Sequence, residues 1–295
     1  MAHTSKLAMR GVALFGASVM ALGLGACSGG KSDSSSGASG GQVTVEMWDY
    51  LSGDTANSSI EASIAEFEKA NPDIKVKRTT FAFADLSKSI LQGSVGGQVP
   101  DVAVVDVVDN QNFASLGMLK DLSNDGINKS DFFEGPWSSV VYEGKTYGIP
   151  LNSNNLALYY NKQMLKDAGV EVPTDWASLK EVAKKTTKGD VKGIAISAVK
   201  SESATFQVLP FVWQTGGDLS NYSESGATAL AYLRGMIEEG SMSEAVSNYT
   251  QEDARTQFIT GKSAMMINGP WELATLTKDA QFDWDVAPLP KDKRA

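Results

Sequence analysis

The 295-residue chain is poor in the side chains that many enzymes use for nucleophilic or metal chemistry, with one cysteine, Cys27, and one histidine, His3. A single cysteine excludes an internal disulfide, and a single histidine excludes a metal site built from several His ligands. The chain also lacks an excess of basic residues, because 35 acidic side chains outnumber 26 basic ones. This balance argues against nucleic acid and anionic membrane surfaces as partners.

The first 26 residues have the pattern of a bacterial secretory signal peptide. Lys6 and Arg10 form its charged start, and the apolar stretch 11–24 is too short to span a bilayer. The four residues Leu-Gly-Ala-Cys that end at Cys27 resemble the lipobox of bacterial lipoproteins. The resemblance implies cleavage before Cys27 and acylation of its thiol, which anchors the protein to the outer face of the cell membrane. An ordinary signal peptide followed by a chance cysteine is the alternative.

Residues 27–41 are mostly Ser and Gly, which cannot form a hydrophobic core, so we expect a flexible tether there. The exported domain then begins near Gln42. It has no histidine, because His3 leaves with the signal peptide, and a Ser-His-Asp triad is therefore excluded. Loss of the two positive charges of Lys6 and Arg10 changes the formal net charge from −9 to −11. The remaining length is sufficient for two lobes.

Strand and helix patterns alternate between residues 42 and 106. Strands are predicted at 42–48 and 74–79, and the helix between them ends at Asn71-Pro72. Asp85 is placed to cap the next helix, which gives way to Gly96-Gly97. The stretch 100–106 is a continuous apolar run, as expected of a parallel strand buried on both faces. This order predicts a doubly wound α/β lobe.

The second half of the chain continues the alternation. The predicted helices lie at 162–168, 173–182, 227–239 and 250–261, and the predicted strands at 194–199 and 284–289. Thr250 and Asp253 have the spacing of a capping box in front of the last of these helices.

The segment 261–273 organises the rest of the chain. It predicts the end of a helix, a short buried strand, a sharp turn at Asn268-Gly269 and a new helix that begins at Pro270. A strand that runs directly into a helix presents side chains at the ligand crevice of an open α/β sheet, and Trp271 stands at that rim. The motif Ile-Asn-Gly-Pro-Trp at 267–271 resembles a hallmark of the maltose/maltodextrin-type solute-binding proteins of bacterial ABC importers.

The resemblance covers essentially all of residues 42–290. It implies a periplasmic-binding-protein-like α/β fold of two doubly wound lobes joined by a hinge. The N-terminal lobe is expected at 42–153, with a return crossing at 286–295, and the C-terminal lobe at 154–285. Members of the family continue beyond this point, so we expect the sequence to be truncated at its C-terminus. The segments that carry the resemblance, besides the motif, are Pro-Asp at 100–101, Gly-Met-Leu-Lys-Asp-Leu at 117–122, a hairpin at 142–150, an interlobe crossing at 151–160 and Ala-Pro-Leu-Pro at 287–290.

The resemblance also implies a function. It predicts a high-affinity receptor that closes around a sugar or oligosaccharide by hinge motion and delivers it to the transmembrane subunits of an ABC permease. No covalent step, cofactor or metal is implied, and we expect a monomer. One alternative is the same fold serving a non-sugar solute. Another is a secreted glycan hydrolase, which needs two carboxylates flanking the scissile bond, and nothing in the sequence fixes such a pair.

A carbohydrate site needs flat aromatic platforms for the apolar faces of the sugar. Trp271 is the leading candidate, because the tryptophan of this motif stacks on a sugar ring in the family. Phe206 and Trp213 lie seven residues apart, so they share a face if residues 203–214 are helical. Core packing is an equal alternative for each of them. Tyr50, in the loop after the first strand, is a further candidate.

Planar polar groups complete such a site by bonding the sugar hydroxyls. Candidates follow the predicted strands, because carboxyl ends of strands are where this architecture binds ligands. Each can instead be structural, for example as a helix cap. The candidates are Asp49 and Ser52 after the first strand, Asp106 and Asp109 after the third, Asn154 at the expected hinge and Asn268 in the turn before Pro270. No catalytic residue is expected.

Overall fold

The computed structural model describes residues 42–294. The predicted signal peptide, the predicted acylation site Cys27 and the predicted tether over 27–41 lie outside the described residues. Within 42–294, no helix is both long enough and apolar enough to cross a membrane. The described residues form two main sheets and one two-stranded hairpin.

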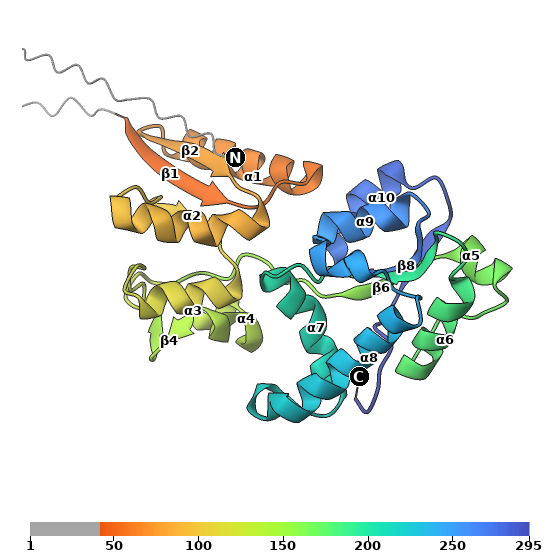
Figure 1. The fold of residues 1–295 in the computed structure, drawn as a ribbon. Coiled ribbons are helices and arrows are strands. Elements are labelled where there is room, and N and C mark those ends of the chain that lie inside the picture. The colour runs from red at the N-terminus through yellow and green to blue at the C-terminus, as the bar shows by residue number, and fades with distance from the viewer. Residues whose placement is uncertain (1–41, 295) are drawn as a thin grey trace, which may run out of the picture. The chain divides into compact units, whose positions relative to one another are not determined.

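The first sheet has parallel strands in the order β2-β1-β3, of which Figure 1 labels β1 and β2. Strand β1 (Val43–Asp49) pairs along its whole length with β2 (Ile74–Thr80), and α1 (Asp54–Ala70) and α2 (Phe83–Gly96) connect the strands. Neighbouring side chains of a strand point to opposite faces. Accordingly, Trp48 packs with the apolar cluster of α2, whereas Asp49 bonds Arg78, which also reaches α1. Helices therefore cover both faces, as predicted for a doubly wound lobe.

Two details of this region differ from the prediction. Helix α2 begins at Phe83 with Ala82 as its N-cap, so Asp85 lies in the first turn and caps nothing. Strand β3 (Val102–Ala103) has only two residues and pairs with β1 alone, and Val102 is 50% exposed. The apolar run 100–106 is therefore not a strand buried on both faces, since only two of its residues form a strand and one of them is half-exposed.

The chain after β3 forms a helical segment and a hairpin. Helix α3 (Val107–Ser115) is followed by the 3-10 turn η1 (Lys129–Asp131) and α4 (Glu134–Ser139). The predicted hairpin is confirmed, with β4 (Val141–Tyr142) antiparallel to β5 (Lys145–Thr146). Its turn needs two residues with positive φ, which Glu143 and Gly144 supply at 48° and 79°.

The second sheet has the order β7-β8-β6-β9 and is mixed. Strand β8 (Ser263–Asn268) is parallel to β7 (Lys192–Ala195), whereas β6 (Ala157–Asn161) is antiparallel to both β8 and β9 (Trp284–Ala287). All six residues of β8 are buried, which confirms the predicted buried strand. This sheet carries the larger hydrophobic core, which includes Leu158, Ile194, Met265 and Ile267.

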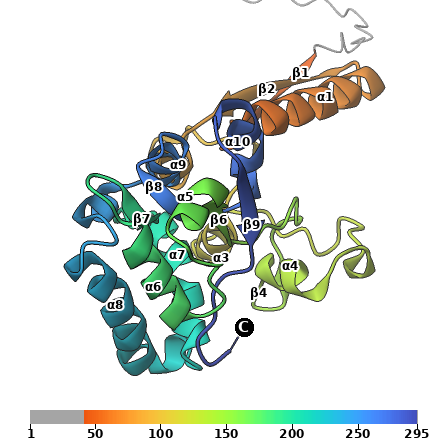
Figure 2. The same ribbon diagram turned by 90° about the vertical axis from the view of Figure 1, so that its right-hand side faces the viewer.

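Helices pack around this sheet (Figure 2). The capping box of Thr250 and Asp253 is present at the start of α9, as predicted, and a second one, of Asp175 and Ser178, begins α6. The elements are α5 (Lys162–Asp167), α6 (Trp176–Thr186), α7 (Glu202–Gln214), η2 (Leu219–Asn221), α8 (Tyr222–Glu238), η3 (Glu244–Asn248), α9 (Gln251–Ile259), η4 (Pro270–Glu272) and α10 (Leu273–Asp279).

The end of the described chain corrects another expectation. Residues 286–294 do not return to the first sheet, because their backbone is bonded to the second region. Strand β9 pairs with β6, and the Lys291 amide donates to the Thr174 carbonyl at 3.1 Å. The Lys293 amide donates to the Gln214 carbonyl at 2.9 Å, so the segment stays beside α6 and α7.

Candidate ligand-binding site

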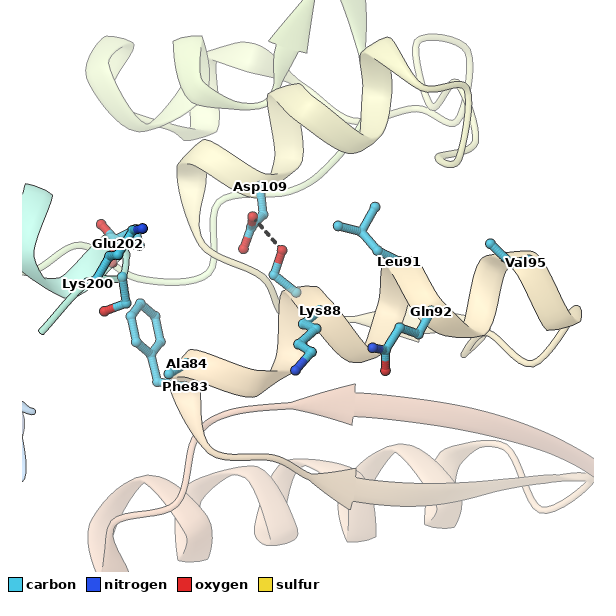
Figure 3. A pocket seen from close by; sticks show the side chains of 11 residues that line it. Phe83, Ala84, Lys88, Leu91, Gln92, Val95, Asp109, Lys200 and Glu202 are labelled. Atoms are coloured by element: carbon cyan, nitrogen blue, oxygen red, sulfur yellow. Dashed lines mark hydrogen bonds between the residues drawn. The ribbon is translucent and has the colours of Figure 1, made fainter.

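A pocket of about 570 Å³ lies between α2 and the start of α7 (Figure 3). Helix α2 forms one wall with the aromatic ring of Phe83 and the apolar side chains of Leu91 and Val95. Asp109 comes from α3, and Glu202 begins α7. Lys88 and Lys200 also line the pocket, so it offers an apolar wall together with charged groups of both signs.

Carboxyl groups gather at one end of this pocket. The Ser87 hydroxyl donates to Asp109 Oδ1 at 2.8 Å, a bond drawn in Figure 3. Burial raises the pKa of Asp109, and the nearby Asp106 raises it further. Burial raises the pKa of Glu202 to about 7, with additional contributions from Asp106 and Asp109. These acids therefore share a poorly hydrated region in which their charges repel.

Tyr50 belongs to the same group. Its ring contacts Phe83 edge-on, with centroids 5.0 Å apart. Burial raises the pKa of its hydroxyl to about 12, and Asp106, Glu202 and Asp109 add to the shift, so the hydroxyl stays a hydrogen-bond donor at neutral pH. The structure thus brings three predicted site residues, Tyr50, Asp106 and Asp109, close to Glu202.

The local sequence explains where these acids stand. Asp106 is the N-cap of α3, where its side chain accepts a hydrogen bond from the Val108 amide at 3.3 Å. Asp109 lies in the first turn of α3, and Glu202 lies in the first turn of α7. Acidic side chains are favourable at helix N-termini because of the helix dipole. Helix capping was one of the two roles considered for Asp106 in the sequence analysis. Only Oδ1 of the carboxylate accepts the capping bond from the Val108 amide, and Oδ2 does not take part in it.

Two predicted aromatic residues meet in the second region. The rings of Phe206 and Trp271 have centroids 6.1 Å apart at an angle of 43°. Both side chains pack against the large core but are only half-buried, so part of each remains exposed to solvent. Phe206 follows Glu202 by four residues on α7, which places the two side chains on one helix face. Neither ring lines the pocket itself, and Glu202, one helical turn before Phe206, is the lining residue of α7 nearest to the pair in the sequence.

Two predicted site residues are structural instead. Asp49 is 0% exposed and accepts from Arg78 at 2.5 and 2.8 Å, and from the Leu51 amide at 2.9 Å. Asn268 is 0% exposed, and its amide group donates to the Gln251 carbonyl and to Glu272 while its oxygen accepts from the Gly269 amide. Both are sealed inside the protein with their polar atoms paired, which corrects the expectation that they face a ligand.

Three other candidates lie apart from both the pocket lining and the Phe206–Trp271 pair. Trp213 is on the face of Phe206 but two helical turns, roughly 10 Å, further along α7, and it is 46% exposed. Ser52 lies in the loop after β1, and Asn154 lies in the segment before β6. Both are exposed, and no hydrogen bond within the described chain restricts their side-chain polar atoms.

Sequence reasoning missed Glu202, Lys88 and Lys200. The rule that ligand-binding residues follow the carboxyl ends of strands selected Asp106 and could also have selected Glu202, which follows β7 and begins the next helix. The lysines carried no such signal, since isolated lysines on a helix or in a loop are usually solvated. Within residues 42–294, no group of three or more His, Cys, Asp or Glu side chains is placed to hold a metal ion.

Known proteins resemble the chain both in sequence and in fold. The maltodextrin-binding protein MdxE of Bacillus subtilis is 28% identical over 303 residues, covering 96% of this chain and 68% of the relative. A binding protein of Brucella abortus is 28% identical over 269 residues and covers 86% of this chain. The GacH receptor of Streptomyces glaucescens, solved unliganded and with acarbose, is 30% identical with a TM-score of 0.73, covering 85% of this chain and 67% of that one.

The chain spans 64% of the length of the Brucella relative, so it corresponds to about two thirds of such a protein. These matches confirm the predicted periplasmic-binding-protein-like α/β fold. The family model of the bacterial extracellular solute-binding proteins matches residues 52–295, which is most of the sequence. The chain therefore belongs to the bacterial extracellular solute-binding protein family.

Proposed function

We propose that this protein is a receptor that binds a sugar or oligosaccharide outside the cell and delivers it to an ABC permease. The observation that carries the proposal is the contact between Trp271 and Phe206, together with Glu202, which lies one helical turn before Phe206 on α7 and lines the pocket with Asp109. Aromatic faces pack on the C–H surface of a sugar, and carboxylates accept hydrogen bonds from its hydroxyls. The relative named as a maltodextrin-binding protein and the GacH receptor solved in complex with acarbose add support.

We propose hinge closure as the way in which the ligand is held. The lobes are 42–153 and 154–285, with the hinge near Asn154, and residues 286–294 are attached to the second lobe. Asp106 and Asp109 belong to the first lobe, whereas Glu202, Phe206 and Trp271 belong to the second. A ligand that bonds both sets favours the closed arrangement by its differential affinity, and closure removes water from the polar contacts.

The protein binds without catalysis in this proposal. The carboxylates of Asp106, Asp109 and Glu202 repel one another. A sugar hydroxyl can donate hydrogen bonds to these carboxylates, and this binding breaks no covalent bond. Incubation with a labelled oligosaccharide, followed by product analysis, tests this point. Turnover that is lost in both Asp109→Asn and Glu202→Gln would favour a glycan hydrolase.

The cellular setting is also part of the proposal. Cleavage before Cys27 and acylation of its thiol hold the receptor, as a monomer, on the outer face of the membrane near its permease. Metabolic labelling with a palmitate analogue tests the anchor: wild type is labelled, and Cys27→Ser is not.

The deciding experiment is a thermal melt of the full chain, purified in mild detergent, against a panel of mono- and oligosaccharides. A ligand that binds only the native state raises the midpoint. We expect Trp271→Ala to weaken binding by about tenfold or more, since loss of a central aromatic anchor costs about 2 kcal/mol. Trp213→Ala, which removes an exposed tryptophan two helical turns beyond Phe206, is the control and keeps wild-type affinity. A cooperative melt that no sugar shifts would overturn the sugar assignment.

A further inference from the structure

The turn between β8 and η4 contains a buried polar network. Glu272 is 1% exposed, and its carboxylate accepts from Arg255 Nη1 at 2.8 Å and from Asn268 Nδ2 at 3.2 Å. Asn268 Nδ2 also donates to the Gln251 carbonyl at 3.0 Å. Because Arg255 and Gln251 belong to α9, this network ties the turn to the helix that precedes β8.

Gly269 is fixed on both sides of its backbone. Its amide donates to Asn268 Oδ1 at 3.0 Å, and its carbonyl accepts from the Tyr159 hydroxyl at 2.7 Å. Tyr159 belongs to β6 and is 2% exposed. The peptide groups of the turn are therefore held by side chains from two different elements, and the position of the following residues is restricted.

The Trp271 ring lies directly against Gly269. A Cβ atom at position 269 would be 2.1 Å from both Cη2 and Cζ3 of the indole, so the indole would have to move to make room for a side chain. The φ angle of Gly269 is −117°, so glycine is needed here for the close approach and not for the backbone conformation. Phe206 contacts the same indole at 6.1 Å between ring centroids. The ring is thus packed between Phe206 and a glycine whose position the network sets.

The ion pair in this network is suited to fixing geometry. Burial raises the pKa of Glu272, while the hydrogen bond from Arg255 acts in the opposite direction. A buried pair contributes little net stability, because desolvation offsets the attraction, but its hydrogen bonds restrict the partners to one arrangement. Removal of the arginine would leave a buried carboxylate without its cation.

We infer that Arg255, Glu272, Asn268, Tyr159 and Gly269 are positioning residues that hold the Trp271 ring in its ligand-binding orientation without touching the ligand. This inference rests on the proposed function, because it treats Trp271 as the sugar platform. Supporting groups whose own positions are locked by packing and hydrogen bonds give a site its precision.

The test compares Arg255→Met, Arg255→Lys, Gly269→Ala and Tyr159→Phe in the full chain. Sugar affinity is measured by calorimetry, and the Trp271 environment is measured as the fluorescence difference between each protein and the same protein carrying Trp271→Phe. We expect Gly269→Ala and Arg255→Met to weaken binding by about tenfold or more and to shift the Trp271 emission. Arg255→Lys restores part of both signals, and Tyr159→Phe gives a smaller loss.

Arg234→Met is the matched control, because Arg234 and Glu238 form an Arg–Glu pair at 2.7 Å on the exposed surface of α8. It leaves both readouts unchanged. Wild-type affinity and emission in both Gly269→Ala and Arg255→Met would overturn the inference. If wild type binds no sugar, the proposed function fails, and the fluorescence difference still decides whether the network positions Trp271.

Discussion

The two sheet regions are stabilised by different means. In the first, only Asp49 among the seven residues of β1 is buried, and the buried apolar cluster consists of Leu86, Ile90 and Phe113. In the second, every residue of β8 is buried, and the main cluster joins β6, β7 and β8 to four of the surrounding helices. The second region therefore gains far more from removal of apolar surface from water.

The first region relies in part on charge. The guanidinium of Arg78 joins β2 to Asp49 of β1 and to Glu61 of α1, and its side chain is 7% exposed. A buried pair of this kind contributes little net stability but is costly to break. The comparison teaches that a sheet with a small apolar core can depend on one buried charge. Loss of that charge is expected to destabilise β1, β2 and α1 together.

The largest expected effect is that of Arg78→Leu. The change leaves the fully buried Asp49 carboxylate without its cation, so we expect a loss of about 3–5 kcal/mol in the free energy of unfolding. Urea denaturation, with hydrogen exchange to locate the loss in β1, β2 and α1, measures it. The double variant Asp49→Leu/Arg78→Leu recovers much of the stability.

Lys77→Ala is the control for this prediction. Lys77 pairs with Glu46 at 2.9 Å between the same two strands, but the side chains are 66% and 38% exposed. An exposed pair is worth about 0–1 kcal/mol, so the change is small. If Arg78→Leu and Lys77→Ala lowered the free energy of unfolding equally, burial of the ion pair would not explain the importance of Arg78 for the first region.

Leu158→Ala tests the apolar side of the comparison. Leu158 is 0% exposed in β6 and lies between Ile267 and Ala287 on the neighbouring strands. Deletion of the buried methyl groups leaves a cavity, and we expect a loss of about 2–5 kcal/mol by urea denaturation. Leu86→Ala, in the smaller cluster, should fall near the low end of this range because its surroundings are less enclosed. Reversed values would contradict the distinction between the regions.

The smallest effect concerns Glu202, which lies where acids of both regions meet. Its pKa rises from the ordinary 4.5 to about 7, mainly through burial. Between these pH values the native state holds more protons than the unfolded state, so stability falls as the pH rises, and the loss persists above pH 7. Glu202→Gln therefore raises the melting temperature at pH 8 and leaves it nearly unchanged at pH 4.5.

Melting curves from pH 4.5 to 8 measure this effect. Glu181→Gln is the control, because Lys185 lowers the pKa of the exposed Glu181. Removal of the Glu181 charge therefore does not raise the melting temperature at pH 8. A pH profile of Glu202→Gln that parallels the wild type would show that the pKa of Glu202 is not raised in the native state.

The sequence predicted most elements because their signals are local. The capping box at Thr250, the Asn71-Pro72 stop and the turn after Asn268 each depend on residues a few positions apart. Strand β3 was predicted too long, because an apolar run does not say whether a partner strand stands beside it. The course of residues 286–294 was wrong for the same reason, since strand pairing is a long-range choice.

The candidate site shows the same limit. The strand-end rule found Asp106, Asp109 and Tyr50, which the fold brings together, but it also selected Asp49. Nothing near Asp49 in the sequence indicates Arg78, which is 29 residues away and bonds it in the adjacent strand. Local order cannot separate a carboxylate aimed at a ligand from one that has an internal cation.

By itself the sequence determined the secretory and anchor pattern, the alternation of strands and helices, and the motif at 267–271 that indicates the family, since each of these is written in neighbouring residues. Only the tertiary structure decided which polar side chains are sealed and which are available. It paired Asp49 with Arg78, enclosed Asn268 beside Glu272, and placed Glu202 near Asp106. The physical reason is that burial and charge pairing depend on groups far apart in the chain, and packing alone brings them together.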